Sequence, residues 1–149
     1  MEDYIIEPLK KDNIEECAKL ANMLWNDYAL GEAVKVFTEE IDKDNISHYL
    51  LKKSNEYIGF LEVSLRCHYV EGCESSPVGY IEGIYIKSEY RKMKYATKLI
   101  DFACELFKSM GCTQIASDCE LENESSIQFH RGIGFEEVNR IVNFVKRIK

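Results

Sequence analysis

The sequence contains little proline and no long apolar segment. Its two prolines, Pro8 and Pro77, lie outside any low-complexity linker, so the 149-residue chain is predicted to form one domain, residues 1–149. No run approaches the roughly 18 apolar residues of a membrane-spanning helix. The N-terminal segment MEDYIIEPLKK carries acids where a signal peptide carries basic residues. These absences argue against membrane insertion and predict a cytoplasmic protein.

Metal-binding and disulfide patterns are also missing. The six cysteines include no Cys-x-x-Cys pair, and the three histidines, His48, His68 and His130, lack the spacing of zinc ligands. We therefore expect no metal centre and free, mostly buried thiols.

Charge is distributed unevenly along the chain. There are 19 basic and 26 acidic residues, a formal net charge of −7. Residues 87–99, KSEYRKMKYATKL, nevertheless hold five basic residues and one acid, Glu89. Nucleic-acid binding is not indicated, because the stretch has no interleaved aromatic stripe and the remaining acidic surface would repel RNA. The pattern instead suggests an anionic partner at this stretch and a cationic partner elsewhere.

Hydrophobic periodicity and turn residues predict the order β, α, α, β, β, β, α, β, α, β, which fits an α/β sandwich with helices on both faces of a mixed sheet. Asp12 or Asn13 can cap the first helix, and Asn123 the last. The expected strands are 4–9, 48–53, 57–70, 78–86 and 112–119, with one or two more in 134–149. The expected helices are 14–25, 31–45, 95–110 and 121–132.

The basic stretch lies between a predicted strand and a predicted helix. The first N–H groups of a helix lack intrahelical partners and the helix dipole is positive there, so this position suits a phosphate group. Arg91, Lys92 and Lys94 add mobile positive charge around it. From local features alone, a solvated charged turn is an equal alternative.

Two motifs in this half of the chain resemble those of the GNAT superfamily of N-acetyltransferases. Residues 91–96, RKMKYA, resemble the R/Q-x-x-G-x-G/A turn that holds the pyrophosphate of acetyl-CoA, with Lys94 where glycine is usual. Asn123, Ser126, His130 and the pair 134–135 match the superfamily's N-x-x-A/S-x-x-x-Y-x-x-x-G-F segment, with histidine in place of tyrosine. The resemblance implies the GNAT fold, with a mixed, mostly antiparallel sheet of six to seven strands, and acetyl-CoA as cosubstrate.

A closer resemblance, to the aminoglycoside 6′-N-acetyltransferases, covers nearly the whole chain. It is carried by the segments LWND, EVSLRCHYVEG, SPVGYIEGIYI, CTQIASD and GFEEVNRIVNFVKR. It implies direct transfer of an acetyl group to the 6′-amine of a polycationic aminosugar antibiotic, resistance to that antibiotic, and a homodimer. The acidity of the chain supports this weakly, since it would attract a compact polycation.

The resemblance also implies which residues form the site, and it implies no metal ligands. For acetyl-CoA they are Ile84, Tyr85, Ile86, Arg91, Lys92, Met93, Lys94, Tyr95, Ala96, Thr97, Asn123 and Ser126. For the antibiotic they are Trp25, Tyr69, Glu82, Asp118 and Glu137.

The chemistry requires a neutral amine, because an ammonium group has no lone pair to attack the thioester. Asp118 or Glu82 can accept its proton, and the sequence does not assign base and binding roles between them. His130 occupies the position from which the family's tyrosine protonates the thiolate of CoA. For the carboxylates the alternative is a structural ion pair, and for His130 and Trp25 it is packing.

Two other functions remain open at this point. The cofactor motifs alone would permit a GNAT enzyme acting on another amine, such as a polyamine or a protein lysine. A module that binds acetyl-CoA without catalysis is the second alternative, and Lys94 is the one feature that favours it.

Overall fold

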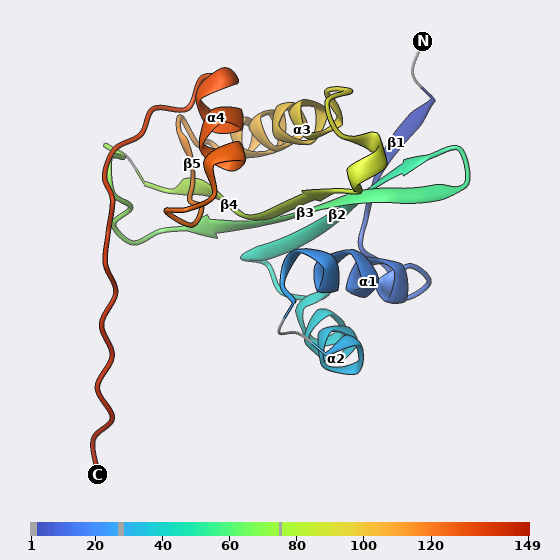
Figure 1. Cartoon of the computed structure of the whole chain (residues 1–149), viewed down its shortest axis with the longest axis horizontal. Helices are drawn as coiled ribbons and strands as arrows, with labels where there is room; N and C mark the ends of the chain where they lie inside the picture. The colour runs from blue at the N-terminus through green and yellow to red at the C-terminus, as the bar shows by residue number, and fades with distance from the viewer. Residues whose placement is uncertain (1–2, 27–28, 75) are drawn as a thin grey trace.

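The computed structural model describes residues 3–26, 29–74 and 76–149, which form one α/β unit around a five-stranded sheet (Figure 1). The strands follow chain order across the sheet: β1 (Tyr4–Pro8), β2 (Ile46–Lys53), β3 (Glu56–Arg66), β4 (Val78–Ile86) and β5 (Ile115–Ser117). The first three pairings are antiparallel and the β4–β5 pairing is parallel. The sheet is mixed as predicted, but the prediction of six to seven strands is wrong for the described residues.

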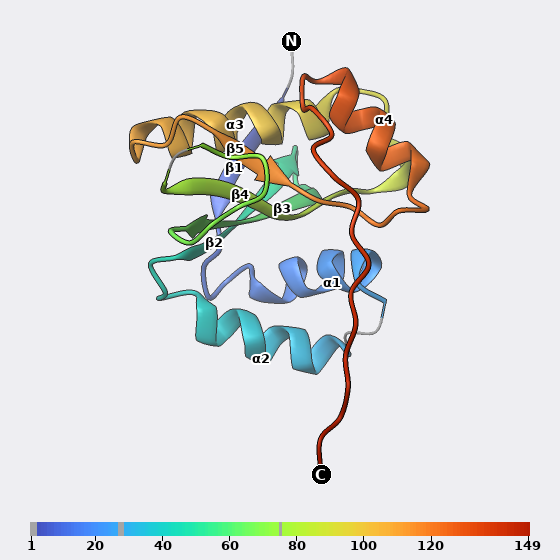
Figure 2. The same cartoon turned by 90° about the vertical axis from the view of Figure 1, so that its left-hand side faces the viewer.

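Helices cover both faces of the sheet (Figures 1 and 2). On one face lie α1 (Ile14–Leu24) and α2 (Leu30–Glu40), which share a core with Phe60 of β3. On the other lie α3 (Tyr95–Ser109) and α4 (Glu124–Gly132), and α3 packs Leu99 and Phe107 into a second core. In α1 the buried positions include Ile14, Cys17, Ala18 and Ala21, the spacing from which the helix was predicted.

Asparagines precede the first and last helices, and only the last is capped by its side chain. Asn123 Oδ1 accepts from the Ser126 amide at 3.1 Å. Asn13 stands at the predicted N-cap of α1, but its buried amide accepts from the Lys10 amide at 2.7 Å and donates to the Pro8 carbonyl at 3.1 Å. It therefore stabilises the β1–α1 connection rather than the helix end.

A bulge in β4 positions one of the predicted site residues. Glu62 of β3 faces Gly83, whereas the next residue, Val63, faces Ile81, so Glu82 is the extra residue on β4. Such a bulge re-aims side chains and increases the local strand twist. It allows Glu82 to reach side chains of β3 that a regular register would not offer it.

The C-terminal segment 136–149 forms no strand in the structure and extends away from the body of the molecule (Figures 1 and 2). Its apolar side chains are exposed, Phe144 at 92% and Val145 at 97%. The predicted final strands are therefore absent from the described chain, because a strand needs a neighbouring edge to pair with and this segment reaches none.

Two smaller expectations are corrected. The strand predicted to reach residue 70 ends at Arg66, and residues 67–77 connect β3 to β4. All six cysteines are free as expected, but only Cys17 and Cys112 are buried. Among the helices of the described residues, none combines the length and apolar character needed to cross a membrane.

Candidate active site

Glu82 is held by an arginine that the sequence analysis did not select. Arg66, at the end of β3, donates through Nη2 to both carboxylate oxygens of Glu82, at 3.0 and 2.8 Å, and through Nε at 3.2 Å. Ser64 Oγ also donates to Glu82. The carboxylate is thus ion-paired and about one-quarter exposed (24%), so it is neither buried alone nor freely solvated.

Tyr80 connects this ion pair to Asp118. The guanidinium carbon of Arg66 lies 3.4 Å from the centroid of the Tyr80 ring, and the Tyr80 hydroxyl donates to Asp118 Oδ2. Burial raises the pKa of Tyr80, and the bond to Asp118 raises it further, so the hydroxyl remains a donor. Asp118 itself lies just beyond β5 and is exposed. One oxygen of its carboxylate is fixed by Tyr80 while the group as a whole faces solvent.

His130 of α4 adjoins the same end of β5. Its Nδ1 lies 2.7 Å from the carbonyl oxygen of Ser126, which can only accept, so Nδ1 carries a proton. In the neutral ring Nε2 then accepts from the Ser117 hydroxyl at 2.8 Å. The rings of Phe129 and Phe135 stand edge-on to the imidazole. The ring orientation is therefore fixed on both sides, beside Ser117 at the end of β5.

Trp25 follows α1 and lies against β4 at the residue next to Glu82. A Cβ added to Gly83 would come within 2.6 Å of the indole ring, so glycine is required for this close approach. The indole also meets Phe60 edge-on at 5.7 Å between ring centroids, and it is only partly buried. Trp25 thus packs against Phe60, as a core residue would, and its ring also lies beside Glu82.

Within the described residues, Tyr69 and Glu137 make no hydrogen bond or ion pair with Glu82 or Asp118. Tyr69 is 75% exposed, and its hydroxyl donates to Glu71 at 2.7 Å. Glu137 forms exposed ion pairs with Arg131 and Arg140, each at 3.1 Å, and these lower its pKa. Glu82 and Asp118 are linked through Arg66 and Tyr80, and Trp25 lies against Gly83, the neighbour of Glu82. His130 contacts Ser117, the residue before Asp118 in the chain.

The predicted pyrophosphate turn stands at the N-terminus of α3. Lys92 and Lys94 both have left-handed backbone conformations, with φ of 64° and 70°. Lys94 thus adopts the backbone conformation that favours the glycine usual at this position, at a cost of about 1 kcal/mol relative to glycine. The first intrahelical bond runs from the Lys98 amide to the Lys94 carbonyl at 3.0 Å, so the amides of residues 95–97 point out of the helix end.

The basic side chains around this turn are exposed, and one of them is fixed by contacts with its neighbours. Arg91 is anchored, because its Nε donates to the Ile86 carbonyl at 2.8 Å and its guanidinium lies 5.4 Å from the Tyr85 ring centroid. Lys92, Met93 and Lys94 project from the surface. Amides, a helix dipole and mobile cations thus converge on one exposed position that suits a phosphate.

The segment Ile84–Tyr85–Ile86 extends beyond the parallel ladder. β5 pairs only with Gly79, Tyr80 and Ile81, so the two strands part after that point. The side chains of residues 84–86 pack alternately into the two cores, so this stretch would bind a ligand through its backbone groups. Asn123 and Ser126 lie at the start of α4, where the Asn123 carbonyl oxygen is used by the helix cap.

Sequence reasoning missed Ser64, Arg66, Tyr80 and Ser117. The first two alternate with apolar residues in β3, and an arginine two residues from a serine in such a strand is the signal that both share a polar face. Their partner on β4 could not be identified from spacing, because the bulge shifts the register by one residue.

The chain is similar in sequence to known proteins. Residues 14–135 match the sequence model of the Acetyltransferase (GNAT) family. Aminoglycoside N(6′)-acetyltransferase type 1 from Acinetobacter haemolyticus is 35% identical over 143 residues, which cover 96% of this chain and 98% of that protein. The protein of the same name from Acinetobacter baumannii is 32% identical over 146 residues, with coverage of 96% and 98%.

Solved structures show the same likeness. The aminoglycoside N-acetyltransferase AAC(6′)-Iy in complex with CoA has a TM-score of 0.93 and 30% identity, covering 99% of this chain and 97% of that one. AAC(6′)-Iy bound to the bisubstrate analogue CoA-S-monomethyl-acetylneamine has a TM-score of 0.91 and 30% identity, covering 97% and 99%.

The fold and these comparisons define an acetyltransferase that uses acetyl-CoA as cosubstrate. The chain belongs to the GNAT family and, within it, to the aminoglycoside N(6′)-acetyltransferases.

Proposed function

We propose that this acetyltransferase transfers the acetyl group of acetyl-CoA to the 6′-amine of aminoglycoside antibiotics by direct attack in a ternary complex, which confers resistance. The observation that carries the proposal is the row Glu82–Arg66–Tyr80–Asp118, which places two carboxylates at the diverging ends of β4 and β5. Full-length similarity to enzymes named for this activity supports the substrate class. The chain acts as one domain, residues 1–149.

Asp118 is proposed as the general base that removes a proton from the 6′-ammonium. It is exposed, and within the described residues only Tyr80 donates to its side chain, through Oδ2, so the other carboxylate oxygen can face the substrate. Glu82 is proposed to hold a further ammonium group, because Arg66 shows that its carboxylate already accommodates a cation. This assignment follows from exposure: the group that must exchange protons with substrate is the more accessible one.

His130 is proposed to supply a proton to the thiolate of CoA from Nε2 of its imidazolium form, returning to the neutral ring, and we expect His130→Phe to lower kcat about tenfold or more. The KM of acetyl-CoA should change less than kcat, because His130 bonds to the Ser117 hydroxyl and to the backbone carbonyl of Ser126, and neither contact involves the basic turn. Steady-state kinetics would measure both. His130→Gln, which retains hydrogen bonding but cannot donate as an acid, is the matched control; unchanged turnover in both variants removes the role.

Trp25 and Tyr69 are proposed to contact the antibiotic through their ring faces, with Glu137 adding negative charge. Trp25→Ala is expected to raise the KM of the antibiotic about tenfold. The KM of acetyl-CoA should stay near its original value, since Trp25 lies beside Glu82 and not beside residues 91–94. An equal rise in both constants would assign Trp25 to core packing instead, consistent with its contact to Phe60.

Residues 91–97 are proposed to hold the pyrophosphate of acetyl-CoA, and the backbone of residues 84–86 its pantetheine arm, with Asn123 and Ser126 opposite. An added extended chain bonds well to a free strand edge. Amides in such an edge can also polarise the thioester carbonyl.

Lys94→Gly tests the turn, because it relieves the left-handed strain and removes a cation. The free energy of unfolding should rise by about 1 kcal/mol. The Kd of acetyl-CoA, measured by calorimetry, should stay constant or increase, since a phosphate contact is lost. Ser54→Gly is the matched control: Ser54 has φ of 54° in the β2–β3 turn, so only its stability should change. Markedly tighter acetyl-CoA binding by the Lys94 variant would contradict the contact.

A homodimer is proposed from the exposed C-terminal segment. A second copy could offer the sheet edge that residues 138–148 lack within one chain, which would supply the sixth strand expected from the sequence. The cytoplasm is the proposed compartment, since the exposed thiols Cys67, Cys104 and Cys119 remain free.

One assay tests the proposed function. Thiol release from acetyl-CoA is measured in parallel with a kanamycin-type antibiotic, its 6′-hydroxyl analogue, spermidine and a lysine peptide. Turnover that requires the 6′-amine supports the proposal. Preferential turnover of spermidine or the peptide would show that the substrate is a polyamine or a protein lysine instead. No turnover despite acetyl-CoA binding would indicate a binding module.

A further inference from the structure

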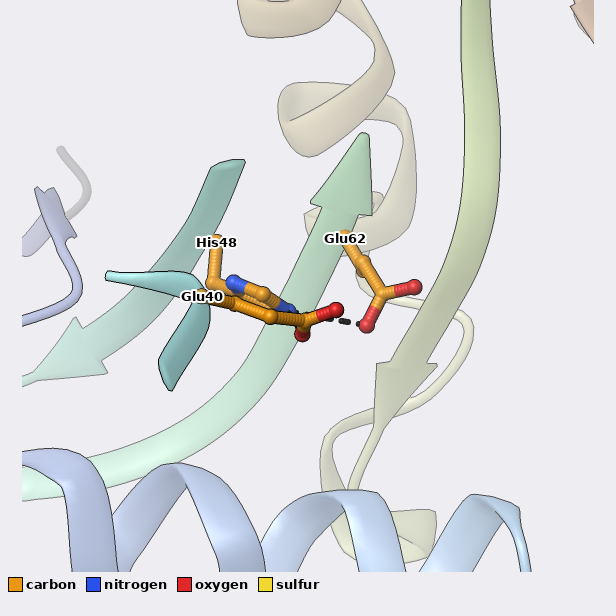
Figure 3. A group of neighbouring side chains, drawn as sticks. All are labelled: Glu40, His48 and Glu62. Carbon is orange, nitrogen blue, oxygen red and sulfur yellow. Dashed lines mark hydrogen bonds and ion pairs between the residues drawn. The ribbon is translucent and has the colours of Figure 1, made fainter. Parts of the chain in front are cut away.

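A buried histidine and two glutamates meet on the α1–α2 side of the sheet, in a cluster that the transfer reaction does not use (Figure 3). Glu40 stands at the end of α2, His48 in β2 and Glu62 in β3. His48 and Glu62 are directly opposite one another in the antiparallel ladder, so their side chains share a face. Three separate elements therefore direct one ligand atom each toward a common point.

The three groups are close and shielded from solvent. His48 Nε2 lies 2.8 Å from Glu62 Oε1 and 3.4 Å from Glu40 Oε1. The side-chain exposures are 1% for His48, 15% for Glu62 and 18% for Glu40. The Phe37 ring lies 4.7 Å from the imidazole, centroid to centroid, and restricts its orientation. Nε2 is thus presented to both carboxylates by a packed ring.

The two carboxylates of this cluster share one imidazole. Within the described residues, His48 forms the ion pairs of both Glu40 and Glu62. Carboxylates that are shielded from water need a compensating positive charge, and a divalent cation placed among the three groups would supply it.

The donor set and its spacing match a transition metal. Imidazole nitrogen and carboxylate oxygen are both ligands of Zn²⁺, at about 2.0–2.2 Å from the metal. Tetrahedral coordination at those lengths separates ligand atoms by about 3.2–3.6 Å. The cluster lies within 4.8 Å throughout, so the 2.8 Å contact needs only to open slightly. A surface pocket lined by Glu40, Lys43 and His48 provides an entrance.

We propose that Glu40, His48 and Glu62 bind one divalent ion of the zinc type, which fastens the end of α2 to β2 and β3. The expectation of no metal centre was based on the spacing of cysteines and histidines along the sequence. Such spacing cannot reveal ligands that come from three separate elements. The site is structural, because none of its residues belongs to the row that includes Glu82 and Asp118. Its test is therefore independent of the acetyl-transfer assay.

The experiment titrates EDTA-treated, desalted full-length protein with Co²⁺ and with Zn²⁺. Co²⁺ reports its ligands through visible absorption, and thiolate ligands add a charge-transfer band that imidazole and carboxylates do not. We expect one equivalent to bind without that band. Saturating metal should raise the Tm by about 5–10 °C. Glu40→Gln should weaken binding about tenfold or more, whereas its exposed neighbour Glu39→Gln should bind like the original protein.

His48→Gln should abolish binding, and the exposed His68→Gln should not affect it. If His48→Gln proves unfolded by circular dichroism, the comparison of Glu40→Gln with Glu39→Gln decides, because Glu40 lies at a helix end and tolerates change. The proposal is overturned if the original protein takes up neither ion. It is also overturned if uptake persists unchanged in Glu40→Gln, or shows the thiolate band of the exposed cysteines.

Discussion

Asp118→Asn is expected to lower kcat/KM for the antibiotic by about 10²- to 10⁴-fold, the usual contribution of a positioned general base. The amide keeps the size of the carboxylate and can still accept from the Tyr80 hydroxyl, so the local fold should persist. What it loses is the ability to take a proton from an ammonium group. Steady-state kinetics with saturating acetyl-CoA would measure the loss, and calorimetry should show unchanged acetyl-CoA affinity.

The matched control for this variant is Tyr80→Phe. It removes the hydroxyl that fixes Asp118 but retains the ring beneath Arg66 and the carboxylate itself. We expect less than a tenfold loss, since one hydrogen bond contributes about 0.5–1.5 kcal/mol. Near-original activity in Asp118→Asn would transfer the base role to Glu82, and Glu82→Gln would then show the larger loss.

Removal of residues 141–149 is expected to convert a dimer into a monomer. These residues carry Ile141, Val142, Phe144, Val145 and Ile148, which are exposed by 72% or more in the single chain. Apolar side chains at such exposure mark a surface that associates. The truncation keeps the contacts of the segment's beginning, namely Asn139 with Glu71 and Arg140 with Glu137. Circular dichroism should therefore report an intact fold.

Sedimentation velocity would compare the full chain, the truncated chain and two single variants. Phe144→Glu should dissociate the proposed dimer as the truncation does, because it places a charge in the segment that would pair with the second copy. Lys149→Glu, at the chain end, should not. A full-length chain that is monomeric at every concentration would refute the proposed dimer, without bearing on the acetyl-transfer activity of a single domain.

Local sequence signals predicted the parts of the structure that depend on local forces. The buried stripe of α1, the Asn123 cap and the start of α3 after Lys94 all follow from periodicity or capping chemistry. The site residues Trp25, Glu82, Asp118 and His130 were named from the family resemblance, and of these the structure links Glu82 to Asp118 through Arg66 and Tyr80. Their roles remain predictions that the kinetics above would test.

Features that arise from tertiary contact could not be predicted. The ion pair of Glu82 depends on a bulge in β4, and the register of two paired strands cannot be predicted from the residue spacing within either strand. The C-terminal strands were predicted from alternation, but alternation cannot say whether a pairing edge lies within the same chain. The cluster around His48 combines residues from α2, β2 and β3, which no short motif contains.

The guanidinium on Glu82 has a consequence for which amines the enzyme can select. A ligand with one amine that enters this position only exchanges one cation for another, so it gains little. A ligand with several amines can reach Asp118 at the same time and retain a net advantage from the second contact. Arg66 would therefore favour substrates with several amines over substrates with one, even when the amines have the same pKa. The ratio of turnover between a triamine and a monoamine of equal pKa would measure this preference.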